Sequence, residues 1–172
     1  LGEDRIVPVL FEHARTLTRS FGGDPNAPAL AAWSKVPTPA RKIHLIVTGS
    51  EVYSGRIKDG FEPVVRKKVD EMGSDLADKQ LATDDPDQIG ELIKNARRAG
   101  AEIILVSGGM SVDPDDKTPE GIRRSGARVE SHGFPILPGS MFVMAYLNET
   151  PVLGLSGCVL HDPFTAFDIL LP

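Results

Sequence analysis

The chain has 172 residues, of which 41% are hydrophobic, and it carries a formal net charge of −5. A chain of this length buries roughly 70% of its unfolded surface, so one domain needs no disulfide or structural metal. The acidic balance without a basic run excludes a nucleic-acid surface, and no stretch approaches the roughly 20 apolar residues of a membrane span. The single cysteine, Cys158, cannot form an internal disulfide, which indicates a cytoplasmic protein of a reducing compartment.

Residues 1–42 have the composition of an extension. Residues 5–11 suit an edge strand, because their proline removes a backbone donor, and residues 12–21 have weak helical spacing. Residues 24–41 carry four prolines, which is typical of a linker. Because the chain starts at Leu1 and not at Met, we expect a fragment of a longer polypeptide, in which this extension is the remnant of a preceding domain.

From residue 43 onward, strand and helix signals alternate. The expected elements are a strand at 43–48, a helix between Asp59 and Gly73, a helix between Asp85 and Gly100, a strand at 101–107, a short helix from Thr118, strands at 142–147 and 151–156, and a helix at 162–171. Such alternation favours a parallel sheet with helices on both faces. The predicted fold of residues 43–172 is therefore α/β, a three-layer α/β/α sandwich with a mostly parallel central sheet.

Three strand ends of this predicted sheet are rich in glycine and polar residues. They are followed by residues 49–59, 108–116 and 157–158, and ligands of open α/β sheets bind beyond such carboxyl ends. The stretch SGGMSVDPDDKTP at residues 107–119 suits a phosphate cradle whose carboxylates hold a hard cation or the N–H donors of a ring. A glycine-rich turn closed by Asp113 and Asp116 explains the same stretch equally well. The endings of the P-loop and the spacing of the Rossmann motif are both absent.

Five polar segments follow one another along the chain. They are residues 47–61 (VTGSEVYSGRIKDGF), Asp84-Asp85, residues 107–122 (SGGMSVDPDDKTPEGI), residues 137–139 (LPG) and residues 154–158 (GLSGC). In order and approximate spacing they resemble the molybdopterin-binding domain of molybdopterin molybdenumtransferases and molybdopterin adenylyltransferases, over about residues 43–172. Five elements in order are far more specific than one. The resemblance implies molybdopterin as the ligand, Mg²⁺ and molybdate as further components, and a homo-oligomer in molybdenum cofactor biosynthesis, nearer to the molybdenumtransferase branch.

The resemblance also implies a set of site residues. The ligand-binding candidates are Thr48, Gly49, Ser50, Gly55, Asp84, Asp85, Ser107, Gly108, Gly109, Met110, Ser111, Lys117, Thr118, Pro138, Gly139 and Gly157. Glu51, Asp59 and Asp116 are the catalytic candidates, and Glu51 with Asp116 is the preferred pair for Mg²⁺, which takes one or two carboxylates plus substrate oxygens. The ligand phosphate would suit the main chain of the glycine pair with Lys117 as a counter-charge, and the pterin donors would suit Asp59 or the pair Asp84-Asp85. Helix capping explains Asp59 and Asp85 equally well.

Two departures from the family pattern keep several functions open. Met110-Ser111 replaces the Thr-Gly of the adenylyltransferase branch, and GLSGCV replaces the Gly-Leu-Pro-Gly-Asn-Pro of the other branch. The first hypothesis is molybdenum insertion on molybdopterin or its adenylylated form. The second is a nucleotide hydrolase resembling the competence-damage-inducible family, whose Gly-Gly-Leu-Gly-Pro-Thr-x-Asp-Asp-x-Thr loop shares its glycines, aspartates and Thr118 with this chain. The third is a pterin-binding module without catalysis.

Overall fold

The computed structural model describes residues 40–170, except residues 112 and 114. Its elements are β1 (Lys42–Thr48), α3 (Ser50–Tyr53), α4 (Phe61–Glu71), β2 (Asp75–Ala82), α5 (Pro86–Arg98), β3 (Ile103–Ser107), α6 (Thr118–Arg124), β4 (Arg128–His132), β5 (Val143–Leu147), β6 (Thr150–Leu155), the 3₁₀ helix η1 (Gly157–Leu160) and α7 (Ala166–Leu170). The strand, helix and linker predicted within residues 1–39 lie outside the described residues. Among the described helices, none has the length and apolar character needed to cross a membrane.

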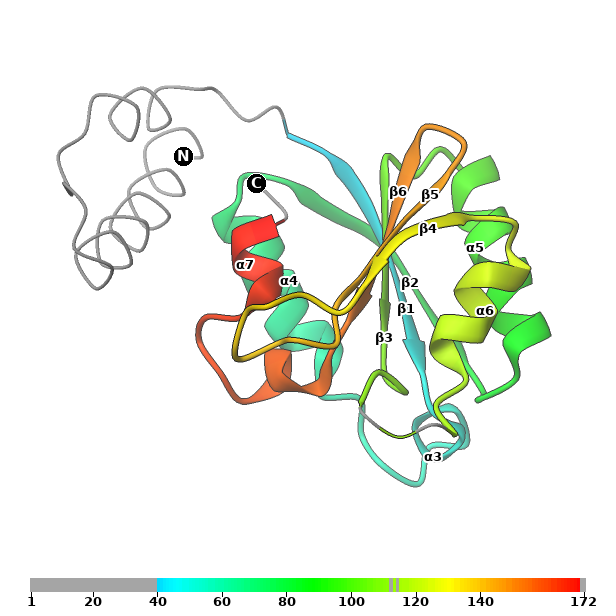
Figure 1. Ribbon diagram of the computed structural model, residues 1–172, viewed down its shortest axis with the longest axis horizontal. Coiled ribbons are helices and arrows are strands. Elements are labelled where there is room, and N and C mark those ends of the chain that lie inside the picture. The colour runs from blue at the N-terminus through cyan, green and yellow to red at the C-terminus, as the bar shows by residue number, and fades with distance from the viewer. Residues whose placement is uncertain (1–39, 112, 114, 171–172) are drawn as a thin grey trace, which may run out of the picture.

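One six-stranded sheet organises the described chain, with the strand order β2-β1-β3-β6-β5-β4 (Figure 1). Strands β2, β1, β3 and β6 are parallel, and β5 is antiparallel to both of its neighbours. The predicted α/β fold with a mostly parallel sheet is therefore confirmed. The sequence pattern predicts neither β2 nor β4, and these two strands form the outer edges of the sheet.

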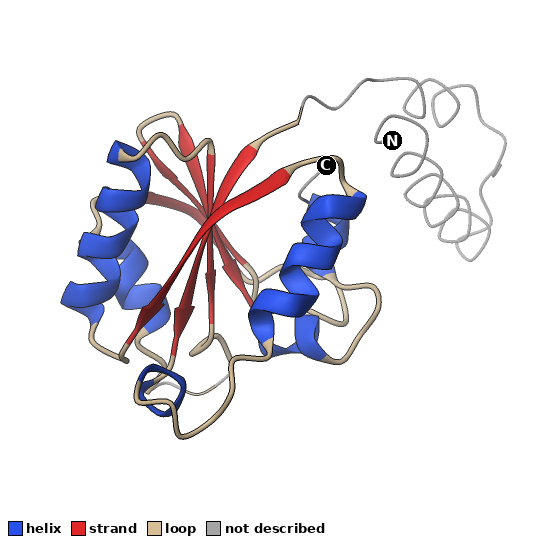
Figure 2. Cartoon of the chain, turned by 180° about the vertical axis from the view of Figure 1, so that it is seen from behind, coloured by secondary structure: helices blue, strands red, loops and turns tan. Residues whose placement is uncertain are grey.

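The sheet separates two hydrophobic cores, and helices cover both of its faces (Figures 1 and 2). The core under α5 and α6 contains Ile89, Ile93, Ala96 and Ile122 from these helices, together with Ile46, Ile104 and Val106 from the central strands. The core under α4, η1 and α7 contains Val65, Val69, Val159 and Phe167, together with Leu45, Val47 and Leu105. Neighbouring residues of β1 and β3 therefore point alternately into the two cores, as period-2 geometry requires.

At two helix starts the predicted capping residue accepts a backbone hydrogen bond. Asp85 is the N-cap of α5, whereas Asp59 lies one position before Gly60, the N-cap of α4. The Asp59 carboxylate accepts a hydrogen bond from the N–H of Phe61 at 2.8 Å, and Asp85 is the N-cap of α5, accepting from the N–H of Asp87 at 3.0 Å. The helix predicted at 162–171 begins later, at Ala166. The reason is a local cap, because the Asp168 carboxylate accepts hydrogen bonds from the N–H and hydroxyl of Thr165.

A buried ion pair joins α4 to α7. The ammonium of Lys68 lies 2.6 Å from Oδ1 of Asp168, and both side chains are more than nine-tenths buried. The same ammonium donates to the carbonyl oxygen of Pro163 at 2.8 Å, while Oδ2 of Asp168 accepts from Thr165. Both charges are thus compensated by hydrogen bonds as well as by each other, which is what a buried charge requires.

His44 of β1 has a buried imidazole ring. It is 4% exposed, and neither ring nitrogen has a hydrogen-bond partner among the described residues. Its Nδ1 lies 3.8 Å from Oδ2 of Asp78 on β2, which accepts a hydrogen bond from Gln80 instead. Burial lowers the pKa of His44, Asp78 raises it in part, and Lys42 lowers it further.

We expect the stability of the fold to fall when the pH is lowered below about 6.5, the pKa of histidine in an unfolded chain. Because the pKa of folded His44 is lower, the unfolded chain binds the proton first. The free energy of unfolding then decreases by up to about 1.4 kcal/mol per pH unit, until the pH passes the folded-state pKa. Urea unfolding at several pH values should show this slope in the parent and a smaller slope in His44→Leu, with His132→Asn as an exposed control. Equal slopes in the parent and in His44→Leu would contradict this assignment.

Candidate functional site

The candidate site lies at the carboxyl ends of β1 and β3, where the chain leaves the sheet in two directions. After β1 the chain continues to α4 on one face, and after β3 it continues to α6 on the other face (Figure 1). Neighbouring parallel strands whose connections diverge in this way leave room between their loops, and such switch points are the usual ligand sites of open α/β sheets. Residues 49–59 and 108–117 are the two loops concerned.

Gly108 and Gly109 begin the second loop in the left-handed region, with φ angles of 94° and 51°. A Cβ on Gly108 would lie 2.3 Å from the carbonyl oxygen of Thr48, and a Cβ on Gly109 would lie 2.9 Å from Oγ1 of Thr118. Packing within the fold therefore explains why glycine is needed at both positions, in addition to any ligand that approaches their main chain. A bulky substitution at Gly109 would strike Thr118 and would not by itself distinguish a ligand cradle from packing.

Three hydroxyl groups lie beneath this glycine turn. The hydroxyls of Thr48 and Thr118 are 2.9 Å apart and hydrogen bond to each other, and both residues are buried. Ser107 is also fully buried, and its Oγ has no hydrogen-bond partner among the described residues. The side chains of Thr48, Ser107 and Thr118, which are predicted to contact the ligand, are therefore buried in this conformation.

The carboxylate of Asp116 forms hydrogen bonds across the segment that follows the glycines. Oδ2 of Asp116 accepts hydrogen bonds from the N–H of Ser111 and from its hydroxyl, the latter at 2.8 Å. The hydroxyl of Ser111 in turn accepts from the N–H of Asp113 at 3.1 Å. Asp116 therefore holds Ser111 in place across the loop, and Lys117 next to it is exposed.

The main chain of the glycine turn keeps free donors. Within the described residues, the N–H groups of Gly109 and Met110 donate no hydrogen bond to a loop, turn or side-chain acceptor. Two successive N–H groups in a glycine turn can point at the same anion, as in a backbone nest. The side chain of Met110 faces inward and is 3% exposed, so contact of this residue with a ligand is restricted to its main chain.

A second carboxylate joins the loops after β1 and β2. Oδ2 of Asp84 accepts hydrogen bonds from the N–H and the hydroxyl of Ser50, at 2.9 and 2.8 Å. The N–H of Gly49 donates to the carbonyl oxygen of Ala82 at 3.1 Å. Ser50 and Asp84, which are both predicted to bind the ligand, are exposed and lie together. Asp85, by contrast, is the N-cap of α5.

Asp59, the last residue of the first loop, has its partners on α4 and β2. One of its oxygens caps α4, and the other lies 3.1 Å from the ammonium of Lys79, which also pairs with Glu62 at 2.8 Å. Glu62 first and Asp59 next raise the pKa of Lys79. The charge of Asp59 is therefore already matched inside the fold. The sequence pattern does not point to Lys79 as a partner of Asp59, because the strand that carries it, β2, has no clear hydrophobic alternation.

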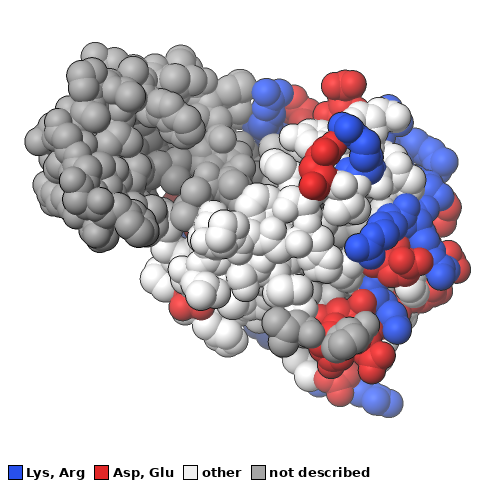
Figure 3. Space-filling model, viewed as in Figure 1, with Lys and Arg blue, Asp and Glu red and all other residues white. Residues whose placement is uncertain are grey.

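The two carboxylates predicted to bind Mg²⁺, those of Glu51 and Asp116, differ in the hydrogen bonds that they make. Glu51 is exposed, and its carboxylate makes no hydrogen bond or ion pair within the described part of the chain. One oxygen of Asp116 is used by Ser111. No cluster of three or more histidine, cysteine or acidic side chains suited to a metal occurs among the described residues. Acidic side chains gather at the lower edge of the face in Figure 3, and the exposed acidic residues near the candidate site are Glu51, Asp84, Asp85, Asp113 and Asp115.

The remaining candidate residues are Pro138, Gly139, Gly55 and Gly157, which take no part in the hydrogen bonds described above. The carbonyl oxygen of Pro138 accepts a hydrogen bond from the N–H of Ala166, and a Cβ on Gly139 would lie 2.8 Å from the same nitrogen, so this turn packs against the start of α7. Gly157 and Gly55 are exposed, and a Cβ on either would meet no atom within 4 Å. The fold therefore gives no packing reason for glycine at positions 55 and 157.

Residues 44–171 match the family described as "Probable molybdopterin binding domain". Among curated proteins, a CinA-like protein of Mycobacterium avium is 33% identical over 89 residues, which is 52% of this chain and 20% of that protein. The matched part thus spans about a fifth of the length of this curated relative.

Solved structures share the fold. The protein CinA from Thermoplasma acidophilum, described as of unknown function, superposes with a TM-score of 0.58 at 18% identity, covering 69% of this chain and 89% of that one. The molybdopterin biosynthesis MoeA protein from Pyrococcus horikosii superposes with a TM-score of 0.55 at 25% identity, covering 75% of this chain and 34% of that one.

Proposed function

Because this chain belongs to the molybdopterin-binding domain family of molybdenum cofactor biosynthesis, we propose that it binds molybdopterin or its adenylylated form at the carboxyl ends of β1 and β3. The N–H groups of Gly109 and Met110 carry the proposal, because they stand at the switch point of the sheet and donate no hydrogen bond within the described part of the chain. Two unpaired main-chain donors in a glycine turn suit the phosphate of molybdopterin. Lys117 is exposed beside them and supplies a mobile counter-charge.

The acceptors at the site fit the ring of a pterin. A pterin presents several N–H donors, and carboxylates accept such bonds well. Asp84 is the favoured partner, because it is exposed and only one of its oxygens is taken up by Ser50. Asp59 is disfavoured, because its two oxygens already serve α4 and Lys79.

Glu51 and Asp116 would hold a Mg²⁺ ion, which prefers carboxylate and phosphate oxygens. Bound there, the ion would neutralise phosphate oxygens of the ligand during transfer. Molybdenum insertion, with molybdate as the substrate, is the reaction we propose for the complete protein, as a cytoplasmic homo-oligomer. Native mass spectrometry of the full-length protein tests both the bound ligand and the subunit number. A nucleotide in place of a pterin would overturn this proposal.

A second candidate function rests on the similarity to a CinA-like protein over 89 residues. It is the hydrolysis of a nucleotide such as ADP-ribose or a nicotinamide nucleotide. Incubation of the full-length protein with these nucleotides and Mg²⁺, followed by chromatography of the products, separates the candidates. Turnover would select the hydrolase, and tight pterin binding without any turnover would select a binding module.

We expect Asp116→Asn to weaken molybdopterin binding by roughly 1–3 kcal/mol, because it removes a charged acceptor that holds Ser111. The thermal midpoint should change little, since the residue is in a loop with few core contacts. Asp115→Asn is the matched control, because it makes the same charge change at an exposed neighbouring side chain. Calorimetric titration with molybdopterin and Mg²⁺ compares the two variants. Equal affinities for Asp116→Asn and the parent would leave Asp116 as a turn former only.

A further inference from the structure

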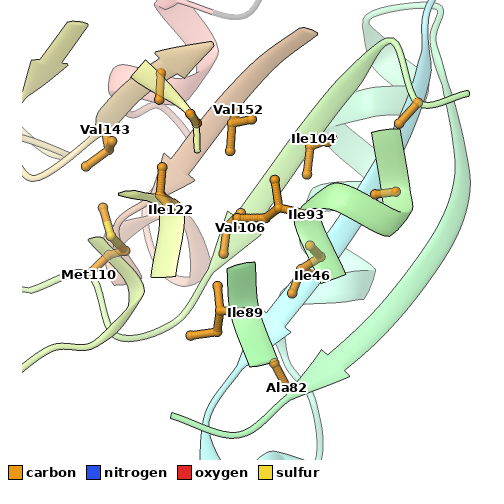
Figure 4. Packing of buried hydrophobic residues seen from close by; sticks show 14 residues of the cluster. Ile46, Ala82, Ile89, Ile93, Ile104, Val106, Met110, Ile122, Val143 and Val152 are labelled. Atoms are coloured by element: carbon orange, nitrogen blue, oxygen red, sulfur yellow. The ribbon is translucent and has the colours of Figure 1, made fainter. Parts of the chain in front are cut away.

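One side chain of the glycine turn is anchored in the hydrophobic core. We define the glycine loop as residues 108–111. Met110 is 3% exposed, and it belongs to the core under α5 and α6, whereas Ser111 next to it is exposed. Figure 4 shows the Met110 side chain on the same side of the sheet as Ile122 and Val143. The loop is thus held by an apolar anchor at one residue and by the bonds of Asp116 at the next.

A glycine in the neighbouring strand makes room for this anchor. A Cβ on Gly154 of β6 would lie 2.8 Å from Cε of Met110, 3.1 Å from Cβ of Val143 and 3.2 Å from Cδ1 of Ile122. Gly154 has no positive φ, so its backbone conformation does not require glycine. Glycine in the interior of a strand weakens the strand and often marks a close approach. The close approach here is that of Met110.

We propose that Met110, seated over Gly154, is the positioning residue of the binding site. This inference rests on the proposed binding of a phosphate by the N–H groups of Gly109 and Met110. Successive glycines leave the main chain many conformations, so a loop without an anchor would have to be ordered by the ligand at a cost in affinity. The buried thioether side chain restricts these conformations before the ligand arrives, which is preorganisation of the donors.

The first test compares Met110→Ala with the parent in the absence of ligand. Hydrogen exchange of the Ser111 amide, which donates to Asp116, should become at least about tenfold faster, because the loop opens locally without its anchor. Met144→Ala is the control of the same residue type, since Met144 packs against the other core. It should lower the thermal midpoint without changing exchange in the glycine loop. Unchanged exchange in Met110→Ala would overturn the anchor.

The second test separates positioning from packing. Gly154→Ala should lower the thermal midpoint, because the new methyl group overlaps Met110. In the double variant Met110→Ala with Gly154→Ala, the methyl group fills part of the emptied space, so the midpoint should recover relative to the sum of the single effects. Calorimetric affinity for molybdopterin should nevertheless stay about tenfold or more below the parent in all three variants. The conservative variant Met110→Leu should keep an affinity close to that of the parent.

The outcomes also separate this inference from the proposed function. If the exchange of the Ser111 amide rises in Met110→Ala while molybdopterin affinity stays at the parent value, the positioning role is overturned and the binding function stands. If the parent itself does not bind molybdopterin, the proposed function fails, and the affinity arm of the positioning role is overturned with it. The anchor would still be decided by exchange and by the coupling between positions 110 and 154, which need no ligand.

Discussion

Gly108→Ala is expected to lower the free energy of unfolding by about 2–6 kcal/mol. A non-glycine residue at a φ of 94° carries a conformational cost of about 1–3 kcal/mol. The added Cβ would also lie 2.3 Å from the carbonyl oxygen of Thr48, and relieving such overlap costs about 1–3 kcal/mol more. Because Thr48 ends β1, the overlap must shift a central strand or the loop itself.

Gly55→Ala is the matched control for this substitution. Gly55 also has a positive φ, 72°, but a Cβ there would meet no atom within 4 Å. It should therefore show only the conformational cost, and the difference between the two variants in urea unfolding measures the overlap with Thr48. Equal losses for the two variants would show that the approach of Thr48 to Gly108 has no energetic consequence.

Asp168→Ala should destabilise the fold by about 3–5 kcal/mol, because it leaves the ammonium of Lys68 buried without its partner. The loss also includes the hydrogen bonds that Asp168 accepts from Thr165 at the start of α7. Thermal and urea unfolding should both show the effect. The exposed pair of Lys67 and Glu71, 3.9 Å apart, is the control, and Lys67→Ala should cost less than about 1 kcal/mol.

The double variant Lys68→Met with Asp168→Leu distinguishes a buried charge from a lost contact. Replacing both charges by apolar side chains removes the desolvation cost of each, so the double variant should be more stable than Asp168→Ala. The recovery should be incomplete, because the N–H and hydroxyl of Thr165 lose their acceptor. A double variant less stable than Asp168→Ala would contradict this account of the pair.

The strongly patterned elements of the fold could be predicted from sequence. Phe61, Val64, Val65, Val69 and Met72, which the spacing places on one face of a helix, all pack into one core. The central strands β1 and β3 are mostly apolar, as strands covered on both faces should be. The two edge strands could not be predicted in this way. Strand β4 has one apolar residue, Val129, in the sequence RVESH, and β2 carries charges at Asp75, Asp78 and Lys79.

The candidate site could be predicted as a set of residues but not as a set of contacts. Its residue types and their places after the strands are visible in the sequence. Which of them pair with one another depends on how the strands are ordered, so the bond between Thr48 and Thr118 and the bond between Ser50 and Asp84 appear only in the folded chain. The burial of Met110 is equally hidden, because its space is provided by Gly154, 44 positions later in the sequence.

The bond between Thr48 and Thr118 has a consequence for the order of events during folding. It joins residues 70 positions apart, and the bond of Ser50 to Asp84 spans 34 positions. Strands β5 and β6, by contrast, are joined by a short turn at Asn148 and Glu149. Loop-closure entropy makes distant pairings slow relative to a local hairpin. We therefore expect the β5–β6 hairpin to form before the carboxyl ends of β1 and β3, which carry the glycine loop, are brought together.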